Sequence, residues 1–173
     1  MPSRESAVAG GSAGERLPLE SLAARGAVVE RFVDSRGLPR FRRLCKPGGD
    51  VRARLSFGSD EGDVRIEGTL SVPVRVDCHR CLESVPVELN TDFAVTAATN
   101  EADATRLGAT SDVLELTSGE PTLAEVIEDE LILALPERPC PKRDCEKAPA
   151  FAYPPDGGRR DNPFESLAAL KKS

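Results

Sequence analysis

The segment VRARLSFGSDEGDVRIEGTLSVPVRVD, residues Val51 to Asp77, carries the strongest structural pattern in the chain. Apolar side chains alternate with polar or charged ones along it, and a third series follows after a short turn. Successive strand residues point to opposite faces, so a period of two predicts strands with one buried face. The alternating apolar positions are Val51, Ala53, Leu55 and Phe57, then Val64, Ile66, Leu70, Val72, Val74 and Val76, then Val85, Val87, Leu89, Phe93 and Val95.

Short turns connect these strands. GSDEGD joins the first pair and CHRCLE joins the second, so an antiparallel meander is the simplest arrangement. Pro73 and Pro86 flank the second turn, where they indicate bends or edge positions because proline cannot donate to a strand ladder. A polar loop over residues 100–111 is expected next, followed by a short strand within residues 112–117.

Three segments outside the strands have helical patterns. Residues 17–33 form a weak amphipathic pattern that is bent or broken near Gly26. The clearest helix covers residues 122–135, because Thr122 and Glu125 match a capping box and Pro136 ends the pattern. A short C-terminal helix follows Asn162. The sequence therefore predicts an α+β fold, in which these helices pack on an antiparallel meander sheet that is open or barrel-like.

Length and composition favour a single domain. A chain of 173 residues can form one substantial core. Residues 1–15 are rich in Ser, Gly and Ala and are expected to form a disordered tail. Residues 16–173 then form one domain, with a Pro/Gly-rich linker near residues 146–161. No signal peptide or long apolar run is visible, and the cysteine count of five is odd, so we expect a cytoplasmic protein without membrane contact.

Two pairs of cysteines are candidate metal ligands. Cys78 and Cys81 lie in a turn between strands, and Cys140 and Cys145 follow the strongest helix. Two thiolate pairs brought together by a fold can supply the four tetrahedral ligands of a structural zinc ion. Reduced thiols in a partial site and a redox disulfide stay open as alternatives. The thioredoxin type of redox motif begins a helix, which this turn does not.

The sequence argues against catalysis. His79 is the only histidine, so a Ser–His or Cys–His pair is not available outside the cysteine turn. No Gly-rich phosphate loop occurs, and a four-cysteine zinc site has no open position for water. We therefore expect no enzyme and no small-molecule substrate. Glu125, Glu128 and Asp129 on one helix could chelate Mg²⁺, which leaves a metal-dependent nuclease as an alternative. Cys45 is interpreted as a partly buried free thiol.

Three motifs occur in order along the chain: CHRCLE at residues 78–83, VIEDELILALP at residues 126–136 and NPFESLAALKK at residues 162–172. Together they resemble the YceD family of bacterial large ribosomal RNA subunit accumulation proteins, over nearly the whole span from Leu17 to Lys172. Cys78 and Cys81 match the C-x-R-C pattern of that family. The resemblance implies a non-enzymatic factor required for normal accumulation of 23S rRNA, during its synthesis, its processing or assembly of the large ribosomal subunit.

The distribution of charge suggests how such a factor could bind. The net charge is −6, but residues 36–54 hold seven basic residues and one acid, a net charge of +6. Arg40, Arg42, Arg43 and Lys46 are candidate contacts to phosphates of 23S rRNA or of a precursor of the large subunit. A solvated loop is the alternative for this segment.

Residues 112–130, by contrast, hold seven acids and no base. Some of these acids are favoured by the dipole at the start of a helix. They could instead face a basic ribosomal protein or another assembly factor. A zinc-stapled protein-binding adaptor that never touches RNA is therefore a further alternative for the function.

Overall fold

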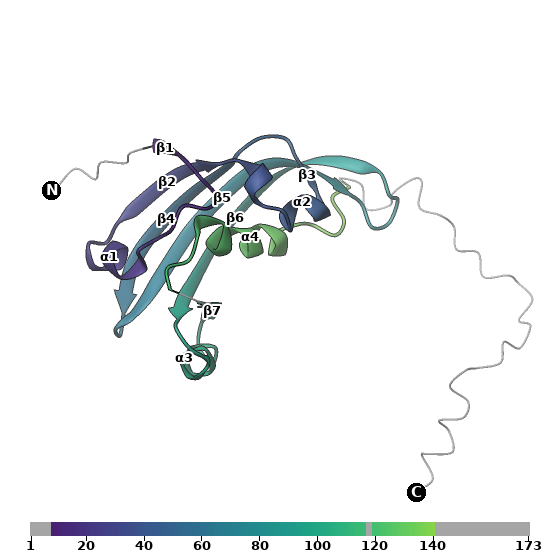
Figure 1. The fold of residues 1–173 in the computed structure, drawn as a ribbon. Coiled ribbons are helices and arrows are strands. Elements are labelled where there is room, and N and C mark those ends of the chain that lie inside the picture. Colours follow the sequence, from purple (N-terminus) through teal and green to yellow (C-terminus); the bar gives the residue numbers. More distant parts are fainter. Residues whose placement is uncertain (1–7, 117–118, 141–173) are drawn as a thin grey trace, which may run out of the picture.

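Three long antiparallel strands form the centre of the structure, which confirms the predicted meander. The computed structural model describes residues 8–116 and 119–140. β4 covers Val51–Asp60, β5 covers Asp63–Asp77 and β6 covers Ser84–Ala98. Within the described residues the sheet is curved but open, so it is not a barrel (Figure 1).

Local backbone geometry explains two glycines of the central strands. Glu61 and Gly62 join β4 to β5 with φ values of 51° and 96°, the left-handed conformation that two-residue hairpins favour. Gly68 lies opposite Phe93 on β6, and a Cβ atom at Gly68 would lie only 2.2 Å from the Phe93 ring. The absent side chain at Gly68 therefore makes room for the aromatic ring.

Shorter strands complete a mixed sheet. β2 (Val28–Val33) pairs antiparallel with β4, whereas β1 (Val8–Gly11) pairs parallel with β2. β7 (Asp112–Glu115) confirms the expected short strand, but it pairs parallel with β6. β3 (Lys46–Pro47) adds a short antiparallel contact to β5. The strand order is β1-β2-β4-β5-β6-β7, so the sheet is mixed: the expected antiparallel meander forms its centre, and a parallel pair lies at each edge.

The predicted helix over residues 17–33 is correct only in its first part. α1 covers Leu19–Ala24, and Gly26, with a φ of 56°, takes the chain out of the helix. The following residues form β2 instead. Val28, Val29 and Val33 are β-branched residues, which favour strands, and the backbone of this segment forms its hydrogen bonds with the edge of β4.

Two other segments differ from expectation. The expected loop at 100–111 contains α3 (Glu101–Leu107), whose first turn is capped by the Asn100 side chain accepting from the Asp103 amide. Within the expected tail over residues 1–15, residues 8–11 form β1, and the Glu15 and Ala13 carbonyls accept from the first amides of α4. The predicted linker and C-terminal helix lie outside the described residues.

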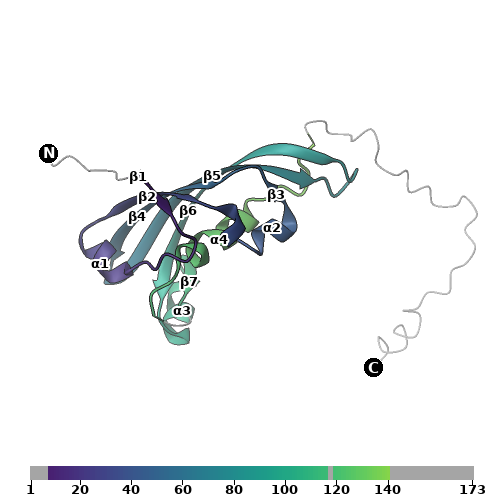
Figure 2. The ribbon, with the colours of Figure 1, turned by 45° about the horizontal axis from the view of Figure 1, so that its top comes forward.

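The helices α1, α2 and α4 cover one side of the curved sheet, as Figures 1 and 2 show. α4 covers Leu123–Leu133 and has the predicted capping box between Thr122 and Glu125, and the short α2 covers Phe41–Leu44. The core lies between these helices and the apolar strand face; its fully buried members include Phe41, Leu38, Leu55, Ile66, Leu70, Leu123, Ile127 and Leu131. The helices of the described residues are all too short or too polar to cross a membrane.

Candidate metal centre and basic segment

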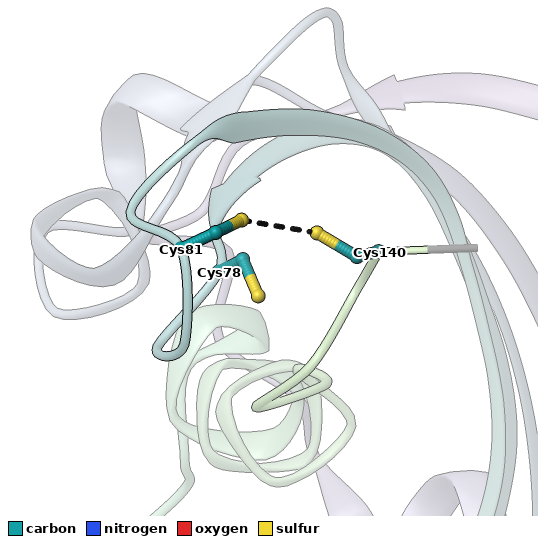
Figure 3. Close-up of side chains that lie close together, drawn as sticks. All are labelled: Cys78, Cys81 and Cys140. Carbon is teal, nitrogen blue, oxygen red and sulfur yellow. Dashed lines mark hydrogen bonds between the residues drawn. The ribbon is translucent and has the colours of Figure 1, made fainter. Parts of the chain in front are cut away.

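Three of the four predicted metal-ligating cysteines lie together. The Sγ atoms of Cys78, Cys81 and Cys140 all lie within 4.8 Å of one another, and those of Cys81 and Cys140 are 3.4 Å apart (Figure 3). Cys78 is fully buried, whereas Cys81 and Cys140 are partly exposed. Cys145 lies outside the described residues. The structure thus brings one member of the second pair to the first pair.

Backbone hydrogen bonds position this cluster. The Cys78 amide donates to the Glu83 carbonyl, and the Leu82 amide donates to the Cys78 carbonyl, so the turn between β5 and β6 folds back on itself. The His79 amide donates to the Glu137 carbonyl, which holds the turn against the segment that follows α4. Cys140 lies three residues further along this segment, and its thiol therefore faces the turn.

The arrangement suits a metal ion that prefers sulfur. Thiolates that share one tetrahedral zinc ion lie about 3.8 Å apart, given Zn–S bonds of about 2.3 Å. The separation of 3.4 Å between the Cys81 and Cys140 sulfur atoms is close to this value and well above the length of a disulfide bond, about 2.05 Å. The three cysteines can therefore hold a metal ion. His79 is exposed and does not belong to the group.

Cys45 is separate from this cluster. It is buried, and burial raises the pKa of its thiol to about 11. Its Sγ atom lies 3.5 Å from the Phe41 carbonyl oxygen, to which the thiol donates. At neutral pH Cys45 is therefore a protonated thiol with a local structural contact, rather than a thiolate ligand.

The basic segment, residues 36–54, contains α2, β3 and the start of β4. Arg42, Arg43 and Lys46 are exposed, and the ion pairs found among the described residues include none of them. Arg40 differs, because its guanidinium lies 2.5 Å from a carboxylate oxygen of Asp129 on α4. Arg42 and Lys46 also border an open hollow of about 450 Å³, together with Arg36, which sequence reasoning did not single out.

The acids of α4 have separate structural partners. Glu125 closes the capping box, where hydrogen bonds from Thr122 hold the pKa of its carboxyl below the usual range. Asp129 pairs with Arg40. Glu128 is buried, and one of its oxygen atoms accepts from the Arg40 and Phe41 amides at 2.7 and 3.0 Å. These side chains face different partners and do not converge as the ligands of one Mg²⁺ ion would, and the helix cap formed by Glu128 was not predicted.

The fold and the cysteine cluster define an open α+β sheet protein with a thiol centre at one end. A family model described as large ribosomal RNA subunit accumulation protein YceD matches residues 66–171. A protein of the same name from Haemophilus influenzae is 32% identical over 130 residues, which cover 71% of this chain and 75% of that protein. No solved structure matches the chain. The chain belongs to the YceD family.

Proposed function

We propose that this chain promotes the accumulation of 23S rRNA by binding, and that it acts in the cytoplasm without catalysing a reaction. Its membership in the YceD family carries this proposal, because both the family model and the Haemophilus influenzae relative are named for accumulation of large-subunit rRNA. The separate partners of Glu125, Glu128 and Asp129 support binding over a metal-dependent nuclease.

The first test measures rRNA in the host. Depletion of the protein should lower the ratio of 23S to 16S rRNA, and a plasmid copy of the wild-type chain should restore it. An unchanged ratio together with normal ribosomes would contradict the proposed function. Purified protein incubated with 23S rRNA and Mg²⁺ should leave the RNA intact, whereas cleavage that is lost in Glu125→Ala and Asp129→Ala would support the nuclease instead.

RNA contact is assigned to the basic segment. Arg42, Arg43 and Lys46 present unpaired charges on an exposed surface, which suits sequence-independent contacts to phosphates. Arg40 remains in the set, but we expect it to contribute less because Asp129 offsets its charge. A plot of log binding constant against log salt concentration has a negative slope. Removing two phosphate contacts should make this slope less steep by about 1.4 for single-stranded RNA.

This assignment has a matched control. The double variant Arg42→Ala/Arg43→Ala should bind a fragment of 23S rRNA more weakly and with the flatter salt dependence. Arg16→Ala/Arg25→Ala removes the same charge near α1, at a distance from α2 (Figure 1), and should bind like the wild type. Equal weakening in both variants would assign the effect to net charge alone. Capture of partners with and without nuclease treatment then shows whether the protein contacts its partner through RNA.

The cysteine cluster is proposed to hold a structural zinc ion, with Cys145 as the fourth ligand. Three thiols within 4.8 Å of one another support this proposal. Zinc would supply a crosslink between the β5–β6 turn and the chain after α4, and it would contribute directly to folding. Arg80, Lys142 and Arg143 lie between ligands in the sequence and could offset the charge of the centre.

Metal analysis tests this part separately. Purified full-length protein should contain about one zinc per chain, and Cys78→Ser or Cys140→Ser should lose both the metal and thermal stability. Cys45→Ser is the matched control and should keep its metal. A metal-free wild-type protein whose melting curve does not change in chelator would refute the zinc site and leave the reduced thiols as its explanation.

A further inference from the structure

In the part of the chain that the structure describes, one edge of the central sheet is uncovered over most of the length of β6. β6 pairs with β5 from Ser84 onward, but β7 pairs only with its last residues, Val95–Ala98. Among the described residues, the backbone groups between Ser84 and Ala94 bond only to β5 and to side chains of β5 and of β6 itself. This stretch is therefore a long free edge, which is the usual template for addition of another strand.

The two prolines determine which groups face outward from this edge. Pro73 lies opposite Glu88, and Arg75 lies opposite Pro86. A proline has no backbone N–H to donate, so both are non-hydrogen-bonded pairs of the antiparallel β5–β6 ladder. The Pro73 carbonyl accepts from the Gly48 amide on the other side of β5, which agrees with this register.

Hydrogen-bonded and non-hydrogen-bonded pairs then alternate along β6. The backbone groups of Glu88, Asn90 and Asp92 point away from β5, while those of Val87, Leu89 and Thr91 bond to it. Two contacts support this assignment. The Asn90 side chain donates to the Glu88 carbonyl, and the Leu116 amide donates to the Ala98 carbonyl on the β7 side.

The charge along this edge selects between partners. Glu88, Asn90 and Asp92 have exposed side chains, and residues 84–94 contain two acids and no base. Two copies of the edge paired about Asn90 would place Glu88 of each copy opposite Asp92 of the other, and like charges in that position destabilise a sheet. A strand with lysine or arginine at these positions would instead form favourable cross-strand pairs.

We propose that the free edge of β6 binds an extended, lysine- or arginine-rich segment of another protein by strand addition. This deepens the proposed function, because it names the surface for a protein partner of the rRNA factor. The basic side chains of the partner would alternate with apolar ones, which would lie beside Leu89 and Phe93 on the opposite face. An open hollow of about 570 Å³ on the outer face is bordered by two acids, Glu67 and Asp92, and by one base, Arg54, which leaves an excess of negative charge beside the edge.

Amide hydrogen exchange of the full chain tests the edge itself. In the free protein, the amides of Glu88, Asn90 and Asp92 should exchange at least ~100-fold faster than those of Leu89 and Thr91, because only the latter bond to β5. Protection of the first set at every protein concentration would show that this chain covers its own edge. Protection that grows with concentration would show that a second copy does. Either result overturns the proposal.

A designed peptide then tests the partner chemistry. A peptide of alternating lysine and valine should slow exchange at Glu88, Asn90 and Asp92 at least fivefold, whereas a glutamate–valine peptide should not. Glu88→Lys/Asp92→Lys should abolish the effect, and Asp60→Lys/Glu61→Lys, with the same change in charge at the β4–β5 turn, should retain it. Absence of protection by the lysine peptide, or equal protection by both peptides, would overturn the proposal. Neither measurement uses RNA, so failure here is distinct from failure of the proposed rRNA function.

Discussion

Replacement of Glu128 by alanine should destabilise the protein more than any other change of an acid on α4. Glu128 is 8% exposed, and one of its carboxylate oxygens accepts hydrogen bonds from the Arg40 and Phe41 amides at the start of α2. Alanine would leave both amides without this acceptor. Because α2 belongs to the basic segment, the change would also loosen the surface assigned to RNA contact.

The magnitude follows from these two bonds. A hydrogen bond to a charged group contributes about 1.5–3 kcal/mol, so the two set a limit of roughly 6 kcal/mol. The Arg40 amide is only partly buried, and water can replace part of its bond. We expect a loss of about 3 kcal/mol for Glu128→Ala. Glu128→Gln keeps a neutral acceptor oxygen and should lose about 1 kcal/mol.

Urea unfolding followed by far-ultraviolet circular dichroism suits this measurement, because the chain has no tryptophan to report by fluorescence. Asp129→Ala is the matched control. It removes an adjacent acid whose ion pair with Arg40 is largely exposed, and such pairs contribute about 0–1 kcal/mol. The expected order of stability is therefore wild type, then Asp129→Ala and Glu128→Gln, then Glu128→Ala.

Two results would refute this reasoning. One is a Glu128→Ala variant that loses no more stability than Asp129→Ala. The other is stabilisation by Mg²⁺ that occurs in the wild type and disappears in Glu128→Ala, because that would identify the carboxylate as a metal ligand rather than a helix cap.

Three further measurements test other parts of the structure. Gly68→Ala should lose about 1–3 kcal/mol in urea unfolding, since its Cβ would overlap the Phe93 ring; an unchanged midpoint would contradict this packing. Cys45, with a pKa of about 11, should react with iodoacetamide at pH 8 about 100-fold more slowly than a free cysteine, and mass spectrometry would show any faster labelling. The pKa of Glu125 is lowered in the folded state, so its carboxylate stabilises the fold at pH values above the ordinary glutamate pKa and loses this effect as pH falls through the pKa of the folded state. The difference in unfolding free energy between the wild type and Glu125→Gln should therefore shrink on acidification. A difference that does not depend on pH would exclude this linkage.

Features set by short-range patterns could be predicted from the sequence. The alternation from Val51 onward predicted β4, β5 and β6, because one buried face imposes a period of two whatever lies on the other side. The capping box between Thr122 and Glu125 likewise predicted the start of α4. The cysteine spacing also predicted that Cys140 would approach Cys78 and Cys81.

Features set by long-range contacts were missed. Residues 28–33 carry apolar residues at spacings that suit a helix or a strand, and the edge of β4 decides for a strand. β7 pairs parallel with β6 because α3 connects the two strands. A tight turn in its place would have made them antiparallel. The sequence suggested a Mg²⁺ ligand or a docking acid at Glu128, because its actual partners, Arg40 and Phe41, are 88 and 87 residues away in the sequence.

Two of the three clustered cysteines, Cys78 and Cys81, lie on the same hairpin as the free edge, which couples the two proposals. β4 pairs with β5 only as far as Ser71, and β3 adds pairs only at Val74 and Arg75, so the tip of the β5–β6 hairpin has little support from the sheet. A two-stranded hairpin is marginally stable in water. A metal bound by Cys78, Cys81 and Cys140 would hold this tip to the chain after α4.

Removal of the metal should therefore loosen the edge before it unfolds the core. In chelator, amide exchange at Val85 and Val87, beside the cysteine turn, should accelerate more than exchange at Val95, where β7 adds support on the other side. The Cys45→Ser variant should show the same difference, because that thiol is outside the cluster. Equal acceleration along the whole of β6 would mean that the cysteines stabilise the fold as one unit, and an unchanged pattern would mean that they bear no stabilising metal.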